Sequence, residues 1–261
     1  MLKKKEMLLT VCSQLAFDLN CDPGDLMREG VTFCQAIAGK GIWLDERQIP
    51  HLKVLTMGKG IVVCADAYIL EIVKPILENQ FRDDLFSAPF LFGHSLYYIP
   101  DAVMLLEQPC PAGISLTWQE GNAIYDLYAN PGFENALRYD RQHPRPDALA
   151  LCAVNKRGEI IGVAGASADN KVIWQIGIDI NKEYRGLGLA SCLVTRLANR
   201  LMERGIVPFY GTASSNIASQ AVAHRSGFKP AWMCNYKHTL DEQSPFQKKA
   251  RVMIQGKEEG S

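Results

Sequence analysis

A regular strand that runs directly into a glycine turn and a long helix restricts the fold of this chain more than any other feature. From Val172 to Ile180 every second residue is apolar, which is typical of a β-strand with one face in a core. Glycines follow at positions 186 and 188, and leucines then recur every fourth residue from Leu189 to Leu201, which predicts an amphipathic helix. This order of elements predicts an α/β fold.

The glycine turn has the properties of a phosphate-binding site. Glycines let a ligand approach the backbone, and the N–H groups at a helix start carry partial positive charge. Arg185 adds a charged donor beside them. Plain packing at a tight connection remains an open alternative for such a turn. A Walker loop would need Gly-Lys-Ser/Thr, and a dinucleotide-binding fingerprint would need an acidic residue after the next strand, whereas Glu203 lies on the predicted helix.

Composition excludes several classes of protein. The 261 residues are 48% hydrophobic and 21% charged, as in globular proteins, and 28 basic residues balance 28 acidic ones, so no nucleic-acid partner is expected. The most apolar stretch, 60–75, carries three charged residues, so no membrane span or membrane partner is expected. Eight scattered cysteines lack metal-ligand spacing, so we expect reduced thiols, no metal and a cytoplasmic protein. The oligomeric state does not follow, and a homodimer remains open.

A cluster of prolines and glycine between Pro100 and Gly113 predicts a domain boundary. We expect a smaller N-terminal α/β domain over 1–110, of unknown role, which would help to build or cover an acceptor pocket. A second domain would follow over 111–255, with a frayed tail over 256–261. The first domain is predicted to contain a helix over 8–19, a strand over 31–37, a strand pair over 53–65 and a helix over 67–78.

The second domain is predicted to begin with a helix over 118–129. Two strands over 148–154 and 160–166 would form a hairpin, because a glycine-containing turn joins them. A further strand over 208–213 precedes a helix that begins after Asn216 and ends before Gly227-Phe228.

Two of these segments together resemble a known family, the GCN5-related N-acetyltransferases (GNAT). Its phosphate-binding segment reads Arg/Gln-x-x-Gly-x-Gly/Ala at a strand-to-helix turn, and residues 183–188 match it except for Glu183 in the first position. The second landmark, an Asn, a helix and Gly-Phe after a strand, occurs over 216–228. The resemblance spans about residues 112–245.

The resemblance implies a mixed, mostly antiparallel sheet flanked by helices and splayed between the strands 172–180 and 208–213. The pantetheine arm of acetyl-CoA would lie in that gap, with the pyrophosphate on the glycine turn. The implied reaction transfers an acetyl group to a primary amine of a small molecule or peptide, by direct attack on the thioester, with acetyl-CoA as co-substrate. The cofactor-binding positions are Ile178, Asp179, Ile180, Arg185, Gly186, Leu187, Gly188, Leu189, Ala190, Ser191, Asn216 and Ser219.

The catalytic groups are less well marked. In the family a tyrosine on the second helix often protonates the departing thiolate, and the matching position here is Ala223, so Tyr236 and His224 are the substitute candidates. Glu120 is the first candidate for the general base, followed by Asp179 and His143, although each also fits a solvated or structural role.

Two alternative functions from other classes of protein are considered. Ala223 and the lack of an evident base also suit a non-catalytic acyl-CoA-binding or regulatory module. A dinucleotide-binding oxidoreductase is disfavoured, because the preceding strands are predicted to be linked by a hairpin rather than by a crossover.

Overall fold

The computed structural model describes residues 2–37, 50–101, 104–105 and 107–240, except for the side chain of Tyr236. The chain forms two compact units, one made of Met1–Val11 and Tyr97–Ala231 and the other of Cys12–Leu96 and Trp232–Ser261. We call the unit that contains Tyr97–Ala231 the cleft unit and the unit that contains Cys12–Leu96 the second unit. They are interleaved along the sequence, so their limits differ from the contiguous ranges 1–110 and 111–255. The expected tail over 256–261 lies outside the described residues.

The chain passes between the units within three elements: α1 (Lys4–Asp18), β4 (Leu91–Pro100) and β10 (Phe228–His238). A contiguous division could not capture this arrangement, because no break in composition marks a crossing that lies inside a helix or a strand. Among the helices that the structure describes, none is both long and apolar enough to cross a bilayer.

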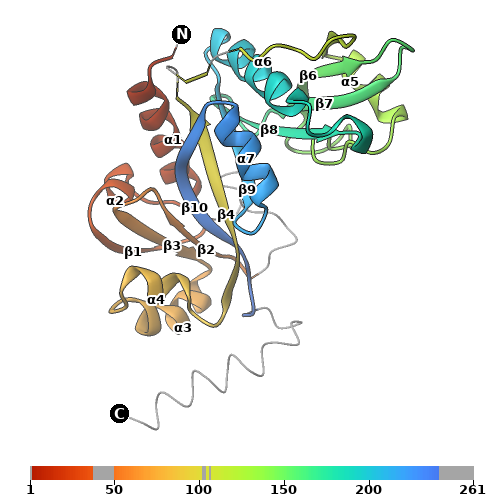
Figure 1. Ribbon diagram of the computed structural model, residues 1–261. Coiled ribbons are helices and arrows are strands. Elements are labelled where there is room, and N and C mark those ends of the chain that lie inside the picture. Colours follow the sequence, from red (N-terminus) through yellow and green to blue (C-terminus); the bar gives the residue numbers. More distant parts are fainter. Residues whose placement is uncertain (1, 38–49, 102–103, 106, 241–261) are drawn as a thin grey trace. The chain divides into compact units, whose positions relative to one another are not determined.

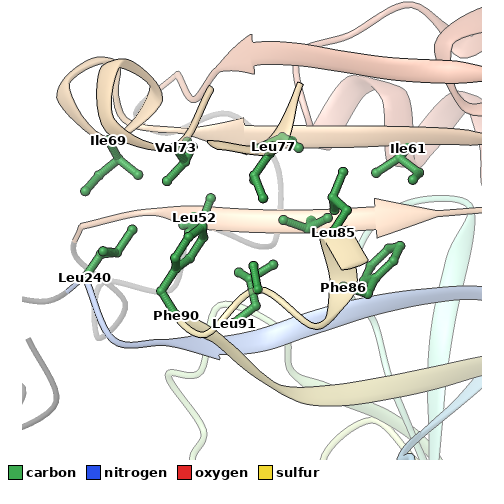
Figure 2. Close-up of a cluster of buried hydrophobic side chains, with 14 residues drawn as sticks. Leu52, Ile61, Ile69, Val73, Leu77, Leu85, Phe86, Phe90, Leu91 and Leu240 are labelled. Carbon is green, nitrogen blue, oxygen red and sulfur yellow. The ribbon is translucent and has the colours of Figure 1, made fainter. Parts of the chain in front are cut away.

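The second unit combines a short sheet with helices. The strand pair expected over 53–65 is the antiparallel hairpin of β2 (Leu52–Thr56) and β3 (Gly60–Ala65), and β1 (Gly30–Gln35) pairs with β3 in parallel. The helix α3 places Ile69, Val73 and Leu77 at four-residue spacing in the core of this unit, where Figure 2 shows them above β2 and opposite Phe90 and other apolar side chains. The elements that lie wholly in this unit are α2 (Pro23–Met27), β1 (Gly30–Gln35), β2 (Leu52–Thr56), β3 (Gly60–Ala65), α3 (Ala67–Leu77) and α4 (Arg82–Phe86).

The cleft unit contains the mixed sheet that the family resemblance implies. Its strands lie in the order β9-β8-β7-β6-β5, and the pairs are antiparallel except for β8 with β9. Figure 1 shows β6, β7 and β8 side by side. The strands are β5 (Ser115–Glu120), β6 (Asp147–Val154), β7 (Ile160–Ser167), β8 (Ile173–Ile180) and β9 (Val207–Ala213). The helices are α5 (Ala123–Asp126), η1 (Leu127–Ala129), η2 (Lys182–Tyr184), α6 (Leu189–Glu203) and α7 (Ile217–Arg225).

The prediction of a helix over 118–129 is wrong for the first part of that range. Ser115–Glu120 forms the strand β5, which pairs along its whole length with β6, and a helix begins only at Ala123. Gly121 separates the two elements with a φ of +59°, a backbone conformation that glycine adopts without strain. The apolar spacing across 118–129 therefore belongs to a strand and a short helix in succession.

The structure confirms the long helix predicted from the leucine spacing, which is α6. Leu189, Leu193, Leu197 and Leu201 are all buried, on the side of the helix that contacts β6, β7 and β8. This packing fixes the helix start at the end of β8. The sheet and α6 thus form a frame that holds the glycine turn in place.

Candidate functional site

A cleft opens in the cleft unit where two neighbouring strands separate. The parallel pairing of β8 with β9 ends at Ile176 opposite Tyr210, although β8 continues to Ile180 and β9 to Ala213. The resulting cavity has a volume of about 620 Å³, within the range of small-molecule sites. It is lined by β8 from Gln175, by β9 from Tyr210, by the glycine turn and by one side of α7.

The glycine turn presents its backbone to this cleft. Gly186 and Gly188 both have φ of +80°, and a Cβ built at either position meets no atom within 4 Å. The space that side chains would fill is thus open beside the first N–H groups of α6. Arg185 is held at this turn by a hydrogen bond of 2.9 Å from its Nε to the carbonyl oxygen of Ile180. These features suit an anionic group such as a pyrophosphate.

The structure brings eleven of the twelve expected cofactor positions together around the cleft. Leu187 is the exception: it is not among the described lining residues, and its side chain is 57% exposed. The eleven are Ile178, Asp179, Ile180, Arg185, Gly186, Gly188, Leu189, Ala190, Ser191, Asn216 and Ser219.

The far wall of the cleft is formed by α7. Asn216 caps this helix, since its Oδ1 accepts a hydrogen bond of 3.0 Å from the N–H of Ser219. The Ser219 hydroxyl in turn lies 2.8 Å from the hydroxyl of Tyr210. Burial raises the pKa of Tyr210, so this phenol holds its proton at neutral pH.

Sequence reasoning missed several lining residues, including Asn135, Gln175, Tyr184, Tyr210 and Arg225. Tyr210 carried a usable signal, because it lies within the strand expected to border the gap. Asn135 carried none, since its loop reaches the cleft only through tertiary contacts.

Asp179, a candidate base, lies in the cleft but serves as an anchor. Its carboxylate accepts hydrogen bonds from the Asn135 N–H at 2.7 Å, from the Asn135 side-chain amide at 2.6 Å and from the Ala136 N–H at 3.0 Å. The loop around these residues also rests on Gly177 and Gly165, where a Cβ would collide with its carbonyl oxygens. Asp179 therefore holds this loop against the sheet.

Glu120, the first candidate base, is placed elsewhere. It ends the strand β5 and is not among the described residues that line the cleft. Its carboxylate receives two hydrogen bonds from Arg204, at 2.6 and 2.8 Å, and these hold its pKa below the usual value. A lowered pKa makes the group a weaker base.

The other candidates are also not gathered at the cleft. His224 is exposed on α7, with its ring 5.4 Å from that of Tyr98, and Ala223 beside it is buried. His143 is engaged within its own loop, where its Nδ1 lies 3.1 Å from the backbone of Arg145. Tyr236 belongs to β10, and its side chain lies outside the described part of the chain.

A family model and a curated protein each match part of this chain. Residues 116–228 match the model of the acetyltransferase (GNAT) family. The uncharacterized N-acetyltransferase YdfB of Bacillus subtilis (strain 168) is 48% identical over 48 residues, which are 18% of each chain.

Solved structures give more distant similarity. A GCN5-related N-acetyltransferase from Kribbella flavida is 15% identical, with a TM-score of 0.43, over 59% of this chain and 62% of that one. A GCN5-related N-acetyltransferase-like protein from Streptococcus suis is 18% identical, with a TM-score of 0.42, over 68% and 72%. The chain thus spans only part of the length of these relatives.

The family match covers the five strands β5 to β9 and both cleft helices, and it contains the glycine turn and Asn216. This segment, residues 116–228, belongs to the GNAT acetyltransferase superfamily.

Proposed function

We propose that the chain is an acetyl-CoA-dependent N-acetyltransferase that transfers an acetyl group to a primary amine of a small molecule or a peptide. The observation that carries this proposal is the cleft between β8 and β9, which ends at an open glycine turn and a helix start. The GNAT family match over the same residues supports it.

The cleft fits the proposed co-substrate in two respects. The backbone of β8 beyond Ile176 is no longer paired with β9, so Ile178 and Ile180 offer peptide groups to the amides of a pantetheine arm. The open space at Gly186 and Gly188 leaves the turn N–H groups accessible to a pyrophosphate. The arm would therefore take the place of strand pairing between β8 and β9.

The reaction itself needs a neutral amine close to the thioester carbonyl carbon. Binding both reactants in one cleft supplies much of the catalysis, because it converts a bimolecular encounter into an intramolecular one. The amine nitrogen forms the C–N bond first, and the C–S bond of the resulting tetrahedral intermediate then breaks. The thiolate leaves with the C–S electron pair, and the amine proton passes to solvent. We assign Asp179 to positioning the Asn135 loop beside the cleft rather than to proton abstraction.

The test is the release of thiol from acetyl-CoA in the presence of a panel of primary amines and short peptides, with acylated product confirmed by mass spectrometry. We expect amine-dependent release with one acetylated product per thiol. Binding of acetyl-CoA without release across the panel would contradict the transferase and favour a non-catalytic acyl-CoA-binding module.

A further inference from the structure

A buried tyrosine hydroxyl lies at the closed end of the cleft. Tyr210 forms the last paired position of β9, opposite Ile176. Its side chain lines the cavity although the residue is only 3% exposed, and its ring packs against Phe228 at 6.3 Å between centroids. The hydroxyl lies 2.8 Å from that of Ser219, and either oxygen can be the donor. The phenol proton is thus free to point into the cleft.

The position of Tyr210 matches the reacting end of the proposed co-substrate. The arm would run from the turn after Ile180 along β8 towards Ile176, where the strands close. Four residues of extended strand span roughly 13 Å. An acyl thioester at the end of that arm would therefore arrive beside the last strand pair, which contains Tyr210.

Acyl transfer from a thioester leaves a thiolate that must gain a proton. A neutral phenol within a closed, low-dielectric end of a cleft can provide it, and a neighbouring hydroxyl can stabilise the phenolate that forms. The Ser219 hydroxyl is placed to do so. Ala223, one helical turn beyond Ser219 on α7, offers no such group.

We propose that Tyr210 is the catalytic acid that protonates the departing thiolate, with Ser219 as its hydrogen-bond partner; this inference rests on the proposed function. As the tetrahedral intermediate collapses, the C–S bond breaks and its electron pair goes to sulfur. The phenol O–H proton passes to that sulfur and gives the free thiol. The proton released by the amine reaches solvent, and solvent returns one to the phenolate, so charge and atoms balance.

Two other tyrosines in the cleft unit show why Tyr210 is singled out. The Tyr184 hydroxyl, near the glycine turn, accepts a hydrogen bond of 3.2 Å from the side-chain amide of Asn155. Tyr98 is as buried as Tyr210 and also reaches α7, where its hydroxyl donates to Gln220 at 3.3 Å, but it is not among the described residues that line the cleft. Tyr98 is therefore a matched control.

The test compares Tyr210→Phe with Tyr98→Phe. Each variant keeps its aromatic ring and loses one hydroxyl that contacts α7. Enzyme-dependent thiol release from acetyl-CoA, measured above the rate of the same mixture without enzyme, is followed with hydroxylamine as acceptor, because this amine is largely neutral at pH 7 and needs no base. Acetyl-CoA affinity is measured by calorimetry, and the rate is recorded at increasing imidazole concentration and constant pH.

We expect Tyr210→Phe to lower kcat about 100-fold, the low end for general acid catalysis, while acetyl-CoA affinity changes less than threefold. Imidazolium should then raise the variant's rate but not that of the wild type, since an external acid replaces the lost one. Tyr98→Phe should keep kcat within about threefold, because its hydroxyl bonds Gln220, and neither residue is among the described residues that line the cleft.

Equal kcat in Tyr210→Phe and Tyr98→Phe, or no response of Tyr210→Phe to imidazole, would overturn the role of Tyr210 while the proposed function stands. A wild-type protein that binds acetyl-CoA but releases no thiol above the enzyme-free rate with hydroxylamine or any amine would overturn the function and this role together.

Discussion

At the scale of single residues, two positions on β8 determine how the Asn135 loop meets the sheet. Gly177 and Asp179 are two residues apart, so they face the same side of the strand. Gly177 lets the loop backbone approach, because a Cβ there would lie 1.8 Å from the carbonyl oxygen of Asn135. Asp179 then accepts three hydrogen bonds from the same loop. Close approach and anchoring come from neighbouring residues on one strand face.

Gly177→Ala is expected to displace this loop. The added methyl group would meet backbone, which cannot rotate away, so we expect a loss of about 1–3 kcal/mol in the free energy of unfolding and faster hydrogen exchange at the Ala136 amide. Gly162→Ala is the matched control, since the nearest atom to its Cβ would be the terminal methyl of Ile180, which can move. Equal stability and equal Ala136 exchange in the two variants would contradict this account.

At the scale of elements, the sequence predicts best what is encoded locally. The strand, glycine turn and helix from Ile173 to Glu203 are set by three patterns within about 30 residues, and all three are confirmed. The edge strand β5 carries only a short signal, because just Leu116 and Trp118 alternate with polar residues in its six positions and none of the six is buried.

Contacts between distant elements account for the remaining errors at the site. Glu120 lies 84 residues from Arg204 in the sequence, and only the folded chain brings them together. Glu120 therefore forms an ion pair at the surface, which its local sequence does not indicate. The Asn135 loop has no regular pattern of its own, so its place beside the cleft depends on Gly165 and Gly177 in two other strands. Most of the predicted cofactor positions line the cleft because they lie in the local strand, turn and helix start from Ile178 to Ser191.

At the scale of the whole molecule, one buried carboxylate links stability to pH. The Asp169 side chain has no exposed surface, and burial raises its pKa to about 6, although Arg145 lies 3.7 Å away and the N–H of Gln175 donates to it at 3.0 Å. The folded chain therefore binds this proton more tightly than the unfolded chain does. The contribution of Asp169 to the free energy of unfolding therefore falls as pH rises from 4 to 6.

Asp169→Asn should remove that dependence. Relative to the variant, the wild type is expected to lose about 2 kcal/mol of unfolding free energy between pH 4 and pH 7, given a pKa near 6 against the ordinary value. Urea unfolding of both proteins at a series of pH values measures the difference. A difference that stays constant across this range would show that Asp169 titrates normally in the folded chain.

The central claim is that the glycine turn between β8 and α6 binds the phosphates of acetyl-CoA. Calorimetric titration with acetyl-CoA tests it most directly, with NADH as the control ligand. Gly186→Val and Gly205→Val form a matched pair, because both glycines have positive φ and open space, at +80° and +76°, and Gly205 lies at the other end of α6. We predict that the wild type and Gly205→Val bind acetyl-CoA but not NADH, and that Gly186→Val binds it at least 100-fold more weakly. Equal affinity in the two variants, or no binding by the wild type, would contradict the claim.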